Sequence, residues 1–149
     1  MPVRVQTQDF DVGSEISCLH KSCQITGAVV SFVGYVRDLS DNVAISQLTL
    51  EHYPEMTEKA LENIIQQAKS RWPIFDALVI HRVGTLKVCE QIVLVAVSAA
   101  HRGDAFKACE FIMDYLKTEA PFWKKETSSK GEFWVEAKDS DELAREKWQ

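Results

Sequence analysis

Several features that would define particular classes of protein are missing from this sequence. It has no run of about 18 apolar residues, so it predicts no membrane span. The first residues do not show the charged-then-apolar pattern of a signal peptide. The cysteines Cys18, Cys23, Cys89 and Cys109 lack paired metal-ligand spacing, and Cys18 and Cys23 with His20 lack a second pair of ligands. We therefore expect a protein of the reducing cytoplasm without a metal site.

An excess of positive charge is also missing. The formal net charge is −5 and the pI is about 5.4, which argues against non-specific binding to nucleic acid or to an anionic membrane. Any anion must then bind in a local basic pocket. The basic residues available for such a pocket are Arg37, His101, Arg102, Lys117, Lys124 and Lys125.

The remaining composition is that of a globular chain. With 46% hydrophobic and 26% charged residues in 149, the sequence predicts one domain over residues 1–149, and it shows no internal repeat or linker. Because several strand pairs have connections too short for a crossover helix, we predict an α+β fold with a mixed, largely antiparallel sheet and helices packed on one side. The expected strands are 1–10, 28–36, 45–53, 77–83, 91–98 and 133–137, and the expected helices are 14–21, 54–72, 104–120 and 141–148. The expected turns and loops are 38–42 and 127–131, of which the second is of a kind that can order over a ligand.

The stretch from His101 to Glu126 carries most of the functional argument. His101 and Arg102 follow the end of the apolar strand 91–98, and Asp104 can cap the helix that comes next. An imidazole, a guanidinium and unpaired backbone N–H groups at the start of a helix suit a phosphate or a carboxylate. Arg102 as a surface cap is an equally open interpretation.

Lys117 lies at the other end of this helix, before Pro121 stops it. A lysine there can also simply complement the helix dipole, and this alternative stays open. Thirteen residues at about 1.5 Å each separate Asp104 from Lys117 by roughly 20 Å, so one small ligand cannot touch both ends. If His101, Arg102 and Lys117 serve one site, a second copy of the chain must supply one end, and we hypothesise a homodimer.

Other positions give weaker signals. Gly34 inside the strand 28–36 predicts a bulge or a close approach by another backbone or a ligand. His52 beside Glu51 and Tyr53 is interpreted as either an acid/base group or a structural hydrogen-bonding residue, and His81 as a structural residue.

A set of short motifs runs through the chain in a fixed order. They are Gly34–Arg37, Leu50–Tyr53 with Met56, Arg71–Pro73, His81–Gly84, Ser98–Arg102, Asp114–Lys117 and Pro121–Glu126. Together they resemble the family of large, catalytic subunits of molybdopterin synthase over nearly the whole chain. The resemblance implies an α/β hammerhead fold and an enzyme that converts cyclic pyranopterin monophosphate into molybdopterin by placing two sulfurs as a dithiolene. It also implies two protein partners: a small ubiquitin-like carrier subunit that brings the sulfur as a C-terminal thiocarboxylate, and a second large subunit within a heterotetramer.

The same resemblance assigns roles to individual residues. Lys117 and Lys124 match the catalytic lysines of the family, while Arg37, His101 and Arg102 match its substrate-binding residues. It implies neither a cofactor nor a metal. The flanking residues expected to line the pocket are Tyr35, Val36, Lys125 and Glu126, with Met113 and Phe122 as candidates for its wall. The segment Val88–Glu90 departs from the family, which usually has a glycine-containing turn there.

Two other classes of function were weighed against the enzyme. A non-catalytic module that docks a ubiquitin-like tail would keep the partner surface but would not need both Lys117 and Lys124. A phosphate-ester hydrolase would need a metal cluster or a pair of nucleophile and base, and no such set is visible in the sequence. The combination of both lysines with Arg37, His101 and Arg102 favours the synthase.

Overall fold

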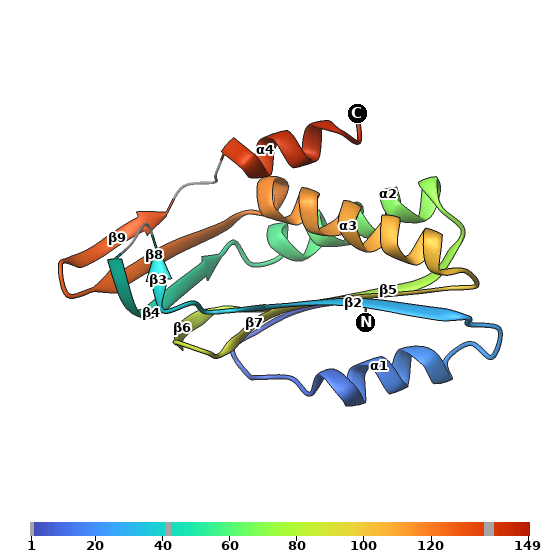
Figure 1. Cartoon of the computed structure of the whole chain (residues 1–149), viewed down its shortest axis with the longest axis horizontal. Helices are drawn as coiled ribbons and strands as arrows, with labels where there is room; N and C mark the ends of the chain where they lie inside the picture. Colours follow the sequence, from blue (N-terminus) through green and yellow to red (C-terminus); the bar gives the residue numbers. More distant parts are fainter. Residues whose placement is uncertain (1, 41–42, 136–138) are drawn as a thin grey trace.

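The computed structural model describes residues 2–40, 43–135 and 139–149, which form two β-sheets with helices packed around the first (Figure 1). This confirms the predicted α+β class. The helices are α1 (Val12–Lys21), α2 (Met56–Arg71), α3 (Arg102–Glu119) and α4 (Asp139–Glu146). The strands are β1 (Val3–Gln6), β2 (Ala28–Tyr35), β3 (Leu39–Ser40), β4 (Val43–His52), β5 (Ile74–Arg82), β6 (Gly84–Lys87), β7 (Gln91–Ala99), β8 (Phe122–Ser128) and β9 (Gly131–Val135).

The first sheet has the strand order β1-β5-β7-β2. Only the β1–β5 pair is parallel, so the predicted mixed, largely antiparallel sheet is confirmed. The helices α2 and α3 cover one face of this sheet, and α1 covers the other (Figure 1). The prediction that all helices pack on one side is therefore wrong for α1, whose Leu19 packs with Ile80 and Leu94. The continuous apolar sequences of β5 and β7 require this second layer, because they present side chains to both faces.

The bounds of α3 follow from its flanking residues. His101 has an extended backbone (φ −130°, ψ 143°) and is the N-cap, so Asp104 lies in the first turn and the predicted cap at Asp104 is wrong. The helix ends at Glu119, and Ala120 is extended. This end was predicted, because Pro121 disfavours a helical conformation in the residue before it.

The second sheet has the order β3-β4-β8-β9, with β6 also paired to β4. It extends beyond the helices at one end of the molecule (Figure 1). Both β6 and β8 run antiparallel to β4. A small apolar cluster joins this sheet to the end of the first one, and its buried members are Val36, Leu48, Leu50, Val83 and Leu86.

The strand β8 corrects the sequence interpretation of this region. The predicted loop at 127–131 is wrong, because Thr127 and Ser128 pair with Glu132 and Gly131 in a tight antiparallel hairpin. The strand predicted at 133–137 corresponds to β9, and its residues 136–137 lie outside the described residues. The turn predicted at 38–42 contains β3, and its residues 41–42 lie outside them too.

One turn has a strained backbone. Cys89, between β6 and β7, has a φ of 73°, in the left-handed region that favours glycine. This is the segment where the family resemblance implies a glycine. The turn is held in place by two backbone hydrogen bonds, in which Cys89 N donates to Val36 O and Val36 N donates to Glu90 O, each over 2.9 Å.

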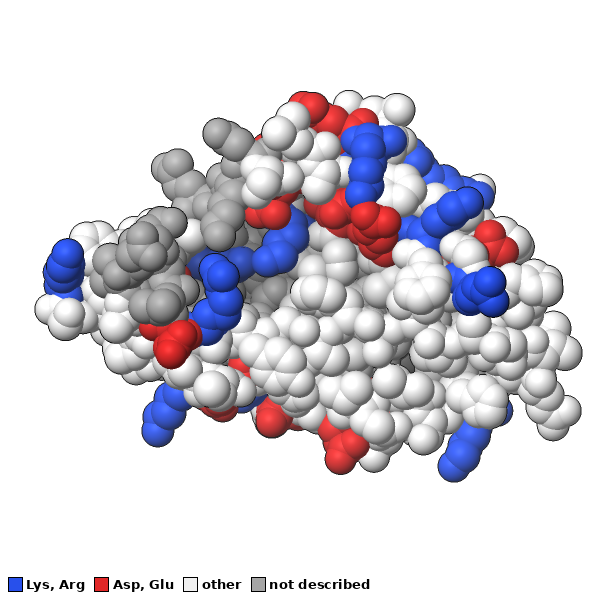
Figure 2. Space-filling model, in the orientation of Figure 1, with Lys and Arg blue, Asp and Glu red and all other residues white. Residues whose placement is uncertain are grey.

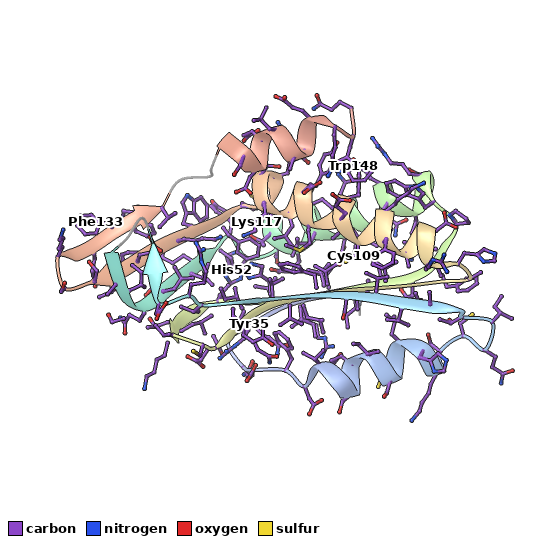
Figure 3. All side chains as sticks on the ribbon, viewed as in Figure 1. Tyr35, His52, Cys109, Lys117, Phe133 and Trp148 are labelled. Carbon is purple, nitrogen blue, oxygen red and sulfur yellow. The ribbon has the colours of Figure 1, made fainter. Side chains whose placement is uncertain are left out.

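The last helix packs along α3. Trp148, just after α4 (Figure 3), packs its ring against Trp72 and Phe111, and its Nε1 donates to Asp114 Oδ2 over 2.6 Å. Its carbonyl oxygen accepts from Arg71 Nη1 over 2.7 Å. Among the described residues, no helix is both long enough and apolar enough to cross a bilayer.

Candidate functional site

A cavity of about 660 Å³ lies where the two sheets meet the C-terminal end of α3. Its basic lining residues are Arg37, Lys117 and Lys124, which come from three separate segments of the chain. On the face drawn in Figure 2, Lys and Arg side chains gather at the hollow between the helices and the second sheet. The cavity also holds the carboxylates of Glu126 and Asp141. A site of this composition can bind an anion and move a proton.

Lys117 is placed by the last turn of α3. The opposite face of this helix is fixed in the core by Phe111, Ile112 and Tyr115, so Lys117 is held at the end that faces the second sheet (Figure 3). Lys117 is exposed, and among the described residues its ammonium makes no hydrogen bond or ion pair. Its ammonium can therefore contact a bound molecule without first breaking a hydrogen bond or ion pair to any of the described residues.

Lys124 is placed by the alternation of β8. Successive side chains of a strand point to opposite faces, so Phe122, Lys124 and Glu126 share the face that lines the cavity. The pairing of β8 with β4 sets Lys124 opposite Leu50 and Glu126 opposite Leu48. The register of this pair therefore decides which lysine reaches the cavity.

Lys125 lies on the opposite face of β8 and does not line the cavity. Its Nζ is 3.5 Å from Glu132 Oε2 and 5.5 Å from the centroid of the Trp134 ring. These contacts join β8 to β9.

The residues predicted from the end of β2 are present in the cavity: Tyr35, Val36 and Arg37 all line it. The predicted irregularity at Gly34 is confirmed, since the register of β2 with β7 shifts between Gly34 and Tyr35. Beyond this shift, the backbone of Val36 is hydrogen-bonded to the turn that contains Cys89. These hydrogen bonds fix the position of the backbone from which the next residue, Arg37, extends.

A buried arginine supports this turn. Arg82 donates to the carbonyl oxygens of Thr7 and Gln91, and its Nη1 lies 3.4 Å from Glu90 Oε1. The pKa of Glu90 is held below its usual range first by the Lys87 backbone N–H and then by Arg82. The ionised Glu90 thus ties the turn that holds Val36 to the first sheet.

His101 and Arg102 lie at the far end of α3, where both are exposed. Sixteen residues of helix separate His101 from Lys117 by about 24 Å. Neither residue lines the cavity of its own chain. A site that contains His101, Arg102 and Lys117 would therefore have to be shared between two copies of the chain.

The sequence interpretation missed His81 as a cavity residue. It is buried at the end of β5, yet it lines the cavity, and its ring stacks on Phe122 with centroids 3.8 Å apart. The local sequence does not indicate that His81 lines the cavity, because Phe122 reaches its ring only through the pairing of β8 with β4. His52 lies 3.8 Å from Glu58 Oε1 through its Nε2. Of the two wall candidates, Phe122 lines the cavity, whereas Met113 is part of the core.

No group of three or more His, Cys, Asp or Glu side chains in the described part of the chain is placed to hold a metal ion. All four cysteines have free thiols. Burial raises the pKa of the Cys109 thiol to about 11, so this group is a neutral core residue.

Comparison with known proteins identifies the family. The family described as MoaE protein matches residues 5–119, more than half of the chain. This chain belongs to the MoaE family. The match includes Arg37, His101, Arg102 and Lys117, and it ends before β8 and Lys124.

Relatives of the MoaE family cover the rest of the chain. The molybdopterin synthase catalytic subunit of Ralstonia nicotianae is 58% identical over 146 residues, which are 98% of this chain and 83% of that protein. The MoaE protein structure from Burkholderia ambifaria has a TM-score of 0.85 and 53% identity, covering 98% of this chain and 96% of that one. A chain from the Helicobacter pylori complex of subunits 1 and 2 of molybdopterin-converting factor shares the fold, with a TM-score of 0.76, 20% identity and 91% of both chains covered.

Proposed function

We propose that this chain is the catalytic subunit of a molybdopterin synthase. It transfers sulfur from the C-terminal thiocarboxylate of a small ubiquitin-like carrier subunit to cyclic pyranopterin monophosphate and so forms the dithiolene of molybdopterin. The observation that carries this proposal is the cavity in which Lys117, Lys124 and Arg37 meet in a chain of the MoaE family.

The two lysines are proposed as the catalytic residues. A thiocarboxylate carries its negative charge over sulfur and oxygen, and an ammonium that contacts the oxygen stabilises the charge that collects there when sulfur is transferred. The second lysine donates a proton, or it acts as the nucleophile at the thiocarboxylate carbon, where the carbon–sulfur bond breaks and the sulfur leaves to the substrate. Lys117 and Lys124 reach the same cavity from α3 and from β8.

The substrate phosphate is assigned to the cationic residues around the lysines. Arg37 offers a planar set of N–H donors at the cavity wall, and Tyr35, Val36 and Glu126 line the same wall. Lys125 contributes through β8, which it holds against β9 by its contacts with Glu132 and Trp134.

His101 and Arg102 complete the site of a second copy. Because they lie about 24 Å along α3 from Lys117, they can join a lysine pair only across a dimer interface. We infer a homodimer in which each cavity takes its lysines from one chain and part of its phosphate-binding set from the other. With two carrier subunits the assembly is a heterotetramer.

The setting of the reaction follows from the same residues. The free thiols fit a reducing compartment, and we propose a cytoplasmic location. The net charge of −5 fits a protein that does not bind nucleic acid or a membrane surface. We infer that residues 1–149 act as one catalytic-subunit domain.

A single-turnover assay tests the proposal. The protein is mixed with thiocarboxylated carrier subunit and cyclic pyranopterin monophosphate, and the dithiolene product is followed by the fluorescence of its oxidised pterin. The expected result is product from the wild-type protein and from Lys107→Ala, but none from Lys117→Ala. Lys107 is the matched control, since it is an exposed lysine on the same helix outside the cavity.

A negative result has a clear meaning in this assay. If the folded wild-type protein binds the carrier tightly and yields no product, the protein is a docking module for a ubiquitin-like tail. If Lys117→Ala loses its circular dichroism spectrum, Lys117 is a structural residue.

A further inference from the structure

His81 is the cavity residue whose chemistry differs most from that of its neighbours. It is only 3% exposed, and this small surface is in the cavity wall. Its ring lies nearly parallel to that of Phe122, with an interplanar angle of 18°. Burial and stacking together fix the plane in which the ring nitrogens lie.

The tautomer of His81 is fixed by its own backbone neighbour. Nδ1 is 2.8 Å from the carbonyl oxygen of Arg82. A carbonyl oxygen only accepts hydrogen bonds, so Nδ1 must carry the hydrogen. In the neutral ring Nε2 then has a lone pair and acts only as an acceptor.

The surroundings keep the ring neutral. The pKa of His81 is lowered to about 3, mainly by burial. The hydrogen bond to the Arg82 carbonyl raises the pKa, and the charges of Lys124, Lys117 and His52 lower it further. A protonated ring would place another positive charge beside the ammonium groups of the cavity. At neutral pH His81 therefore presents a neutral acceptor.

The cavity also contains positive donors, negative acceptors and the hydroxyl groups of Tyr35 and Ser140. Arg37, Lys117 and Lys124 donate to anionic oxygens, and the carboxylates of Glu126 and Asp141 compete for the same cations. A pterin ring also carries neutral N–H donors. A neutral imidazole acceptor of fixed orientation suits them.

We propose that His81 is a specificity-determining residue whose Nε2 accepts a hydrogen bond from an N–H group of the pterin ring. The inference rests on the proposed function, because it takes cyclic pyranopterin monophosphate as the ligand. It deepens that function by separating recognition of the pterin ring from binding of the phosphate.

Two variants isolate the proposed hydrogen bond. In His81→Asn the amide N–H can still donate to the Arg82 carbonyl, but no atom occupies the position of Nε2. In His81→Gln the longer side chain places its amide oxygen near that position. The dissociation constant for cyclic pyranopterin monophosphate is measured by pterin fluorescence with the protein alone, and kcat and KM are measured with thiocarboxylated carrier.

The expected result is a dissociation constant and KM raised about 3- to 10-fold in His81→Asn, as for the loss of one hydrogen bond, with kcat within about twofold of wild type. Most of the affinity returns in His81→Gln. An unchanged dissociation constant in folded His81→Asn overturns the inference, and so does a loss of kcat without a change in binding.

A spectroscopic measurement on the wild-type protein avoids any dependence on variant folding. With ¹⁵N-labelled histidine, substrate should shift the Nε2 resonance of His81 while Nδ1 keeps its proton. An Nε2 resonance that does not respond to bound substrate overturns the inference. If the wild-type protein binds the substrate but makes no product with carrier, the proposed function fails and the His81 measurements still decide their own question. If it does not bind the substrate, both fail.

Discussion

The two sheets of this protein use their strands in different ways. In the first sheet, β5 and β7 are covered on both faces, and Val79, Val95 and Val97 are all 0% exposed. In the second sheet, β8 and β9 leave Trp123, Phe133 and Trp134 exposed, and β8 also lines the cavity with Phe122, Lys124 and Glu126. The fully buried core therefore lies around the first sheet, whereas the second sheet supplies one wall of the cavity. Chemistry at the junction can then vary with little effect on the core.

The largest effect is expected on the rate of sulfur transfer when Lys124 of β8 is replaced, and its neighbour Lys125 provides the control. Lys124→Ala should lower the rate of sulfur transfer by about 10²- to 10⁴-fold, because it removes a cation that contacts the reacting groups. Lys125→Ala is the matched control and should stay within about threefold, since Lys125 faces away from the cavity. Single-turnover rates at saturating carrier measure both. Equal losses of rate in the two variants would contradict the assignment of the catalytic lysine to the face of β8 that lines the cavity.

The helical layer over the first sheet should show the opposite behaviour. Phe111→Ala removes a ring that is 0% exposed and packs against Trp72, Tyr115 and Trp148. The free energy of unfolding should fall by about 3–5 kcal/mol. Phe133→Ala in β9, where the ring is 54% exposed, should change it by less than about 0.5 kcal/mol. Urea unfolding measures both, and a similar loss in the two variants would contradict the comparison.

The pH dependence of stability should report on the junction between the sheets. The folded-state pKa of His81 is lowered to about 3, so below about pH 6.5 the unfolded state binds a proton that the folded state does not. The folded state therefore loses free energy of unfolding as pH falls from about 6.5 toward 3, because only the unfolded state is stabilised by taking up this proton. Between pH 7 and pH 5 the wild-type protein should lose about 2 kcal/mol of unfolding free energy more than His81→Gln does. Urea unfolding at several pH values measures this, and parallel profiles for the two proteins would contradict it.

The smallest effect is expected at the turn that supports Arg37. Cys89→Gly should raise the free energy of unfolding by about 0.5–1 kcal/mol, because glycine adopts a φ of 73° without the strain that a side chain causes. Cys89→Ala is the control and keeps the strain, so its stability should stay close to that of wild type. Thermal unfolding compares the three proteins. A less stable glycine variant would show that the Cys89 side chain makes a net contribution in this turn.

The sequence predicts features that depend on neighbouring residues better than features that depend on contacts between distant segments. The end of α3 before Pro121 and the irregularity at Gly34 depend on residues that are adjacent in the chain, and both were predicted. The double cover of β7 could also be inferred from its unbroken apolar sequence. The position of α1 on the second face was missed, because its short apolar stripe does not indicate which face of the sheet it meets.

The candidate site shows the same limit. Lys117 could be placed from the helix alone. The strand β8 was missed, since the polar sequence from Lys124 to Ser128 resembles a loop, and only its pairing with β4 decides that Lys124 and not Lys125 faces the cavity. His81 was interpreted as structural for the same reason, because a contact with Phe122 across 41 positions of the chain leaves no local pattern.

The length of α3 has a genetic consequence if the proposed dimer forms. Two inactive variants, Lys117→Ala and Arg102→Ala, carry their defects at opposite ends of one helix. When both are made in the same cell, each mixed dimer contains one site with both defects and one with neither. Random pairing then leaves about a quarter of all sites intact. Two alleles that each abolish the pathway alone should therefore complement each other.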